Sequence, residues 1–128
     1  MIYFVICTLF LAPRIFASSA PRIIYSAVIY NVQDSPIQCS VIWSQPPPDP
    51  TLESGLFTIE KHDYYIVKSK VIQLEGWEAN GIIQQIRCGN LLLSAPFDKV
   101  TSPEKNWKFR VESDEIISVG PSSSHTYN

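Results

Sequence analysis

Residues 82–97, IIQQIRC-GN-LLLSAPF, constrain most strongly what this chain can fold into. Gly and Asn accept the positive φ of a tight hairpin turn, so Gly89-Asn90 between two apolar runs predicts a β-hairpin. Because side chains alternate along strands, one face would carry the pairs Cys88–Leu91, Ile86–Leu93, Gln84–Ala95 and Ile82–Phe97. The other face, with Ile83, Gln85, Arg87, Leu92 and Ser94, is mixed. The pattern therefore places Cys88 on the core side of the hairpin.

A second cysteine lies on a strand with the same kind of alternation. In residues 37–43, Ile37, Cys39, Val41 and Trp43 share one face. Two inward cysteines on different strands predict a Cys39–Cys88 disulfide across the core. Two free buried thiols and a catalytic cysteine are the competing interpretations. Neither cysteine has a histidine nearby in the sequence, which disfavours a nucleophile.

The rest of the chain reads as short strands separated by turns. Residues 22–32 are apolar on both faces, which indicates a central strand or one that changes sheets. Further strands are predicted at residues 57–60, 64–74, 106–112 and 116–119. No long apolar run has helical spacing. About seven to eight short strands predict an all-β fold, a small antiparallel β-sandwich, immunoglobulin-like or related, with one disulfide.

The two ends of the sequence differ from this pattern. Residues 1–19 predict a secretory signal peptide, because an apolar run at 2–12 precedes small residues from Ala17 onward. An N-terminal anchor and a buried first strand are the alternatives. The sandwich would then occupy residues 20–119, and residues 120–128 would form a flexible polar tail. We therefore expect a secreted, extracellular protein without an integral membrane span after cleavage.

Charge and motifs limit the chemistry. Loss of the leader with Arg14 leaves nine of the ten basic residues against twelve acidic ones, so nucleic acid is not an expected partner. No phosphate-binding, serine-hydrolase or metalloprotease motif occurs, and we expect no enzyme activity, cofactor or metal. Adjacent His62 and Asp63 would point to opposite faces of a strand, so a solvated turn histidine is expected there. A hydrolase would require convergence of the loop carboxylates, which are those of Asp49, Glu53, Asp63 and Asp98.

Two loops are the candidate contact sites. The proline-rich segment with Pro46, Pro47, Pro48 and Asp49 is stiff and suits recognition, although a rigid connector between sheet edges is the commoner explanation for such a segment. Trp77 lies in the predicted loop at residues 75–81, either as an exposed anchor or folded back over a core edge. We predict a monomeric binding protein for an extracellular protein, glycan or surface. A protease inhibitor using the proline-rich loop and a structural matrix or coat subunit are the alternatives.

Expression of the full chain in a secreting host tests the leader. We expect the intact mass of a mature chain that begins at Ala20 or Ser18, because Ala17 and Ser19 suit the small-residue positions of a cleavage site. Mass spectrometry of the secreted protein measures this. A secreted product that retains residues 1–19 would contradict the prediction.

Overall fold

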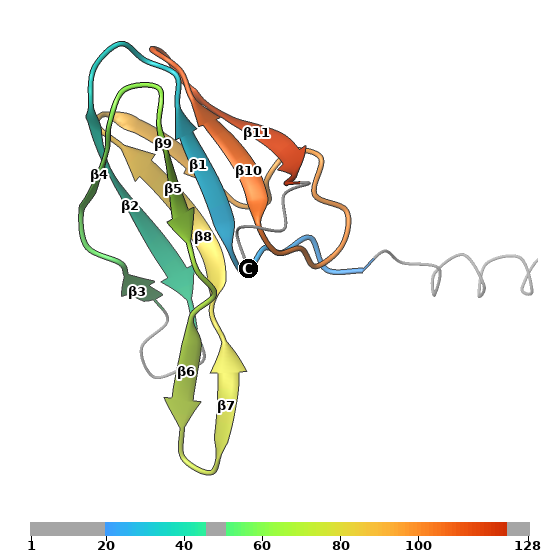
Figure 1. Ribbon diagram of the computed structural model, residues 1–128. Helices are drawn as coiled ribbons and strands as arrows, with labels where there is room; N and C mark the ends of the chain where they lie inside the picture. Colours follow the sequence, from blue (N-terminus) through green and yellow to red (C-terminus); the bar gives the residue numbers. More distant parts are fainter. Residues whose placement is uncertain (1–19, 46–50, 123–128) are drawn as a thin grey trace, which may run out of the picture.

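Eleven β-strands and no helix form the described part of the chain, residues 20–45 and 51–122, in the computed structural model (Figure 1). The predicted signal peptide, the proline-rich residues 46–50 and the end of the predicted tail, residues 123–128, lie outside the described residues. The strands form two larger sheets and one separate two-stranded hairpin. The predicted all-β sandwich with one disulfide is confirmed.

The first sheet has four strands. Their order is β11 (Ile116–Pro121), β10 (Trp107–Val111), β1 (Ala27–Asn31) and β5 (Tyr64–Val67). Neighbouring strands are antiparallel except β1 and β10, which run parallel with Ala27 opposite Trp107. The sandwich is therefore not purely antiparallel as predicted, because the first strand pairs with a strand from the end of the chain.

The second sheet has five strands. Its path is β3 (Thr51–Glu53), β2 (Ile37–Ser44), β8 (Ile82–Cys88) and β9 (Leu91–Ser94), and β4 (Phe57–Ile59) also pairs with β2. All these pairs are antiparallel. The remaining strands, β6 (Val71–Leu74) and β7 (Trp77–Asn80), pair only with each other and project beyond the sandwich (Figure 1).

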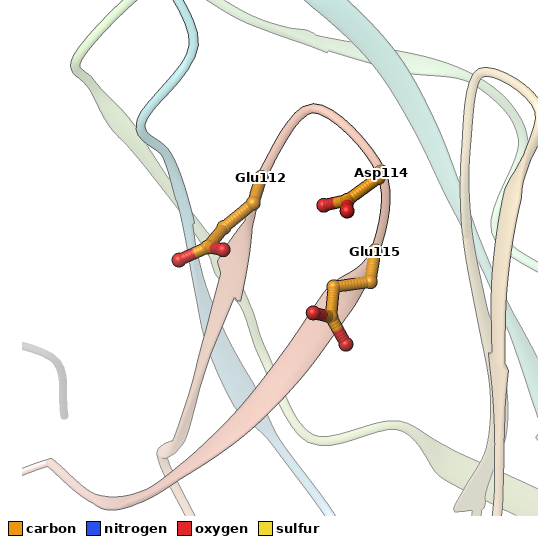
Figure 2. A group of neighbouring side chains, drawn as sticks. All are labelled: Glu112, Asp114 and Glu115. Carbon is orange, nitrogen blue, oxygen red and sulfur yellow. The ribbon is translucent and has the colours of Figure 1, made fainter.

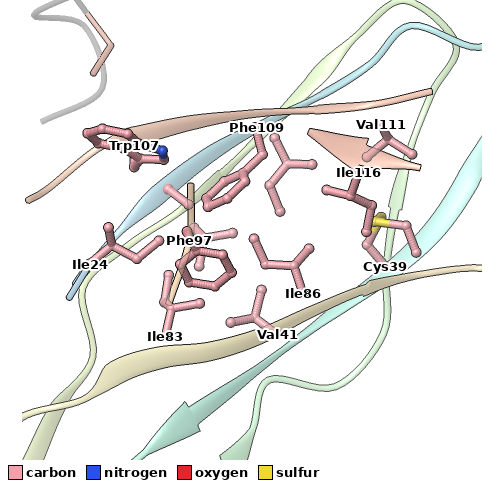
Figure 3. Close-up of a cluster of buried hydrophobic side chains, with 14 of the residues drawn as sticks. Ile24, Cys39, Val41, Ile83, Ile86, Phe97, Trp107, Phe109, Val111 and Ile116 are labelled. Atoms are coloured by element: carbon pink, nitrogen blue, oxygen red, sulfur yellow. A yellow bond between two sulfur atoms is a disulfide. The ribbon is translucent and has the colours of Figure 1, made fainter. Parts of the chain in front are cut away.

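The core lies between the two sheets. Side chains such as Phe109 and Val111 from the first sheet point toward Val41 and Ile86 from the second (Figure 3). Phe97 meets Phe109 edge-on, with ring centroids 5.1 Å apart. Burial of these apolar side chains is the main favourable contribution to folding.

The first strand is central, which explains why both its faces are apolar. β1 lies between β10 and β5, and Ala27, Val28 and Ile29 are all fully buried. Before β1 begins, the chain also touches the other sheet, because the Ile83 N–H donates to the Ile24 carbonyl oxygen at 2.9 Å. The segment thus serves both sheets, as its composition suggested.

The predicted hairpin at residues 82–97 forms, with one local difference. Cys88 faces Leu91 and Ile86 faces Leu93, and Gly89 has the positive φ of 57° that the turn needs. Between its pairs with Ile42 and Trp43 of β2, however, β8 contains one extra residue, Gln84, which forms a β-bulge.

The bulge reverses the inward and outward positions at the start of β8, before Gln85. Ile83, predicted on the mixed face, is completely buried, whereas Gln84 is exposed and Ile82 is only half-buried. The prediction that Gln84 and Ile82 face the core was therefore wrong. The bulge explains this, because a shift of one residue exchanges the two faces of a strand.

The disulfide joins Cys39 and Cys88, as predicted, but in a different place. The two residues are direct neighbours on β2 and β8 of the same sheet, with Cα atoms 4.0 Å apart. The bond therefore staples two adjacent strands and does not cross the core to the opposing sheet. Both cysteines are fully buried under the first sheet.

Three strand limits also differ from the prediction. The single strand expected at residues 64–74 is divided into β5 and β6, which belong to different sheets. Residues 77–80, expected in a loop, form β7, and the last strand continues to Pro121, two residues into the predicted tail. Pairing partners distant in the sequence set these limits, and propensity along the chain does not reveal them.

Loss of the disulfide should destabilise the sandwich strongly. The bond closes a separation of 49 residues, for which the chain-entropy relation gives about 4 kcal/mol. We expect the double variant Cys39→Ala with Cys88→Ala to lose about 2 to 4 kcal/mol of unfolding free energy, measured by chemical denaturation. A loss below about 1 kcal/mol would show that strand pairing alone fixes the register.

Candidate functional site

The hairpin β6–β7 is the element that stands apart from the sandwich. Leu74 pairs with Trp77, so Glu75 and Gly76 form its turn, where Gly76 has a φ of 80°. Its strands have no other strand partner among the described residues. A two-stranded hairpin is only marginally stable alone in water.

One face of this hairpin is entirely apolar. Because Ile72 pairs with Ala79 and Leu74 with Trp77, these four side chains share a face, called here the apolar face. Trp77 remains 57% exposed, and the other three are half-buried. The opposite face carries Val71, Gln73, Glu78 and Asn80, and the Gln73 amide donates to the Glu78 carboxylate. One apolar face and one polar face are typical of a strand pair that packs its apolar face against another surface.

The base of the hairpin packs closely on the sandwich. The Gly81 N–H donates to the Lys70 carbonyl oxygen at 2.8 Å. A Cβ atom at Gly81 would lie 3.2 Å from Cε3 of buried Trp43 and 3.5 Å from Cδ1 of Ile72. Glycine thus permits a close approach here, and the apolar face continues directly to the Trp43 ring.

A groove of about 510 Å³ opens beside this base, between the edge formed by β3 and β4 and the edge strand β5. Its wall combines polar and charged residues with apolar ones, which are Trp43, Leu52, Leu56, Phe57, Tyr65, Ile66 and Val67. Phe57 and Tyr65 stack with ring centroids 3.9 Å apart, and Leu56 is 70% exposed. An exposed leucine beside stacked aromatic rings is an open apolar surface at the sandwich edge.

Three charged residues also line the groove. Lys68 and Lys70 lie on the segment between β5 and β6, and Glu53 lies at the end of β3. The sequence indicated only that the two lysines would be exposed or would protect a strand edge. Both are exposed, and their position beside the groove makes that side of it basic.

The predicted contact residues have different outcomes. Trp77 is exposed, but it lies on β7 and not in a loop, so the predicted loop at residues 75–81 was wrong. Pro46, Pro47, Pro48 and Asp49 lie outside the described residues. The sequence missed the apolar face because Ile72 and Leu74 were assigned to a long strand and Trp77 to a loop. The alternation around Glu75-Gly76 was the signal that could have found it.

A cluster of carboxylates lies at the turn between β10 and β11 (Figure 2), which the sequence reasoning did not single out. The ligand oxygens of Glu112, Asp114 and Glu115 lie within 4.8 Å of one another, and Arg110 Nε donates to Glu112 Oε2 at 2.8 Å. A cation would meet three carboxylates here, but nothing else in the described residues points to one. Asp114 and Glu115 are exposed, so water solvates their charge.

The acidic residues considered for a hydrolase serve separate purposes where they are described. Glu53 lines the groove, Asp63 Oδ1 accepts the Tyr64 N–H at 2.8 Å, and the Asp98 carbonyl accepts the Ser118 hydroxyl. Asp49 lies outside the described residues. None of the three belongs to the carboxylate cluster. Of these three residues, only Glu53 lines any of the described cavities.

His62 occupies a polar turn, as expected. Its Nε2 lies 2.9 Å from Asp34 Oδ1, and both side chains are largely in water. His62 therefore contacts Asp34, whereas the Asp63 carboxylate accepts a hydrogen bond from the neighbouring Tyr64 N–H. Exposed pairs of this kind contribute little to stability.

Comparison of the chain with protein-family models, with curated proteins and with solved structures gave no match. Among the described residues, no helix has the length and apolar character that a membrane crossing requires. The functional assignment therefore rests on the geometry of the hairpin β6–β7 and the groove.

Collisional quenching of fluorescence tests the exposure of Trp77. Trp43 and Trp107 are 3% and 2% exposed, so iodide should reach Trp77 alone in the folded protein. Trp77→Phe should abolish nearly all of the quenching, and denaturant should restore it by exposing the other two rings. Efficient quenching in the folded Trp77→Phe variant would contradict the described burial.

Proposed function

We propose that this protein is a small secreted, non-catalytic interaction protein, and that the hairpin β6–β7 is its contact element with Trp77 as the anchor. The observation that carries the proposal is the apolar face with its exposed tryptophan on a strand pair outside the sandwich. Tryptophan is enriched among the residues that dominate binding energy, because it buries a large area at a small entropic cost.

The backbone of this element supports the same proposal. Paired strands and the close approach at Gly81 hold Trp77 in place before any partner arrives. Preorganisation lowers the entropy that binding must overcome. Burial of the exposed part of a tryptophan contributes on the order of 2 kcal/mol by apolar area alone. A single anchor residue that contributes this much supplies a large share of the binding free energy of a complex of moderate affinity.

The surroundings of Trp77 favour a protein over a glycan or a lipid surface. Aliphatic side chains from Ile72, Leu74 and Ala79 surround it on the apolar face, whereas a glycan would need several polar groups there. Glu75 and Glu78 stand near the end of the hairpin and would be repelled by anionic lipid headgroups. The net acidity of the chain likewise disfavours nucleic acid.

Secretion is part of the proposal. The Cys39–Cys88 disulfide is compatible with an oxidising compartment. The apolar leader at residues 2–12 provides a route there. Protease inhibition through the proline-rich loop depends on residues 46–50 and stays a prediction from the sequence.

Partner capture with matched variants tests the proposal. Tagged wild-type protein, Trp77→Ala and Leu92→Ala are compared on material from the source that expresses the protein, and the affinity of each captured partner is then measured. Leu92 is the control because it is 56% exposed on β9, away from the hairpin. Trp77→Ala should weaken binding by about 30-fold or more, and Leu92→Ala by less than about threefold. Equal binding by all three proteins would refute the proposed contact element.

A further inference from the structure

The hairpin β6–β7 has opposite charges at its two ends. Lys68 and Lys70 precede β6 at the base, whereas Glu75 and Glu78 stand at and beside the turn. The apolar face lies between these ends. β6 has four residues, so the two charged ends are separated by about 13 Å. Charges at this distance act separately at physiological salt.

The groove and the apolar face belong to one continuous surface. Lys70 and Trp43 both line the groove, and both lie within 3.4 Å of the Cβ position at Gly81. Ile72 approaches the same position at 3.5 Å, and Ile72 begins the apolar face. One side of the molecule therefore carries a hollow with a basic margin at the base of the hairpin and a protruding tryptophan with acidic neighbours at its tip.

A surface with these features is complementary to itself. We propose that the partner of this surface is a second copy of the chain: two hairpins pack antiparallel about a twofold axis, and each Trp77 enters the groove of the other copy. This rests on the proposed function and names its partner. A twofold axis makes every contact reciprocal, so the acidic tip of each copy meets the basic base of the other.

The chemistry of the groove suits such an occupant. The stacked rings of Phe57 and Tyr65 in its wall offer aromatic surface to an indole ring. Lys68 and Lys70 lie where the tip of the other hairpin arrives; that tip carries Glu75 in its turn and Glu78 on the opposite face of the hairpin. The two lysines outnumber Glu53, the acidic residue in the groove wall. The association should therefore weaken as salt increases. The proposed reciprocal dimer differs from the monomer predicted from the sequence, and the oligomeric state in solution decides between them.

Variants with exchanged charges provide the decisive experiment. Their self-association is measured by sedimentation equilibrium on the disulfide-bonded protein without the leader. Variant A is Lys68→Glu with Lys70→Glu, and variant B is Glu75→Lys with Glu78→Lys. Each variant alone has like charges at both ends of the hairpin and should be monomeric. An equimolar mixture should form a one-to-one heterodimer, because each tip again meets an opposite base. The control Lys61→Glu with Lys105→Glu changes the same charge on exposed residues elsewhere and should dimerise like wild type.

Trp77→Ala should weaken the dimer by about 30-fold or more, with an unchanged circular dichroism spectrum. Wild-type protein that stays monomeric up to about 1 mM, or a mixture of A and B that stays monomeric, would overturn the dimer. Binding of monomeric wild type to phosphatidylcholine vesicles would overturn it in favour of a lipid surface.

The same variants separate the two proposals. If wild type is monomeric but Trp77→Ala still loses a captured foreign partner, the dimer is refuted and the proposed contact element stands. If Trp77→Ala changes neither self-association nor capture, both are refuted.

Discussion

The second sheet depends on the pairing of β2 with β8. This ladder, stapled where Cys39 meets Cys88, joins β3 and β4 on one side to β9 on the other. β8 also begins immediately after Gly81, where the hairpin β6–β7 returns to the sandwich. The register of this one strand pair therefore determines both how the core is filled and where the contact element leaves the fold.

Much of this arrangement could be read from local sequence. The Gly89-Asn90 turn and the alternation on both sides of it were sufficient for the hairpin β8–β9, and two inward cysteines were sufficient for the disulfide. The bulge at Gln84 could not be predicted, because it arises from the match between β8 and a strand about 40 residues earlier. The alternation of side chains along one strand does not show which of its residues the partner strand leaves unpaired.

The candidate site was predicted only in part, for a related reason. Trp77 was singled out as a candidate contact residue, with its exposure left open. Its companions on the apolar face were not, since alternation continues without a break through Lys68 and Lys70. What divides β5 from β6 is a change of partner, from β1 to β7. The groove could not be predicted at all, because it forms where the edges of two sheets meet. Features that depend on contacts between distant segments cannot be predicted from the local pattern of residues.

The parallel pairing of β1 with β10 has a consequence for how the molecule is made. The residues that begin these strands lie 80 positions apart, as with Ser26 and Asn106, whose side chains also meet. During synthesis β1 emerges among the first segments of the sandwich and β10 among the last, so the first sheet cannot close until nearly the whole chain is available. Distant pairing of this kind slows folding and makes it cooperative. The protein therefore acquires its final shape in a late step, and an incomplete chain would expose the edge of β1.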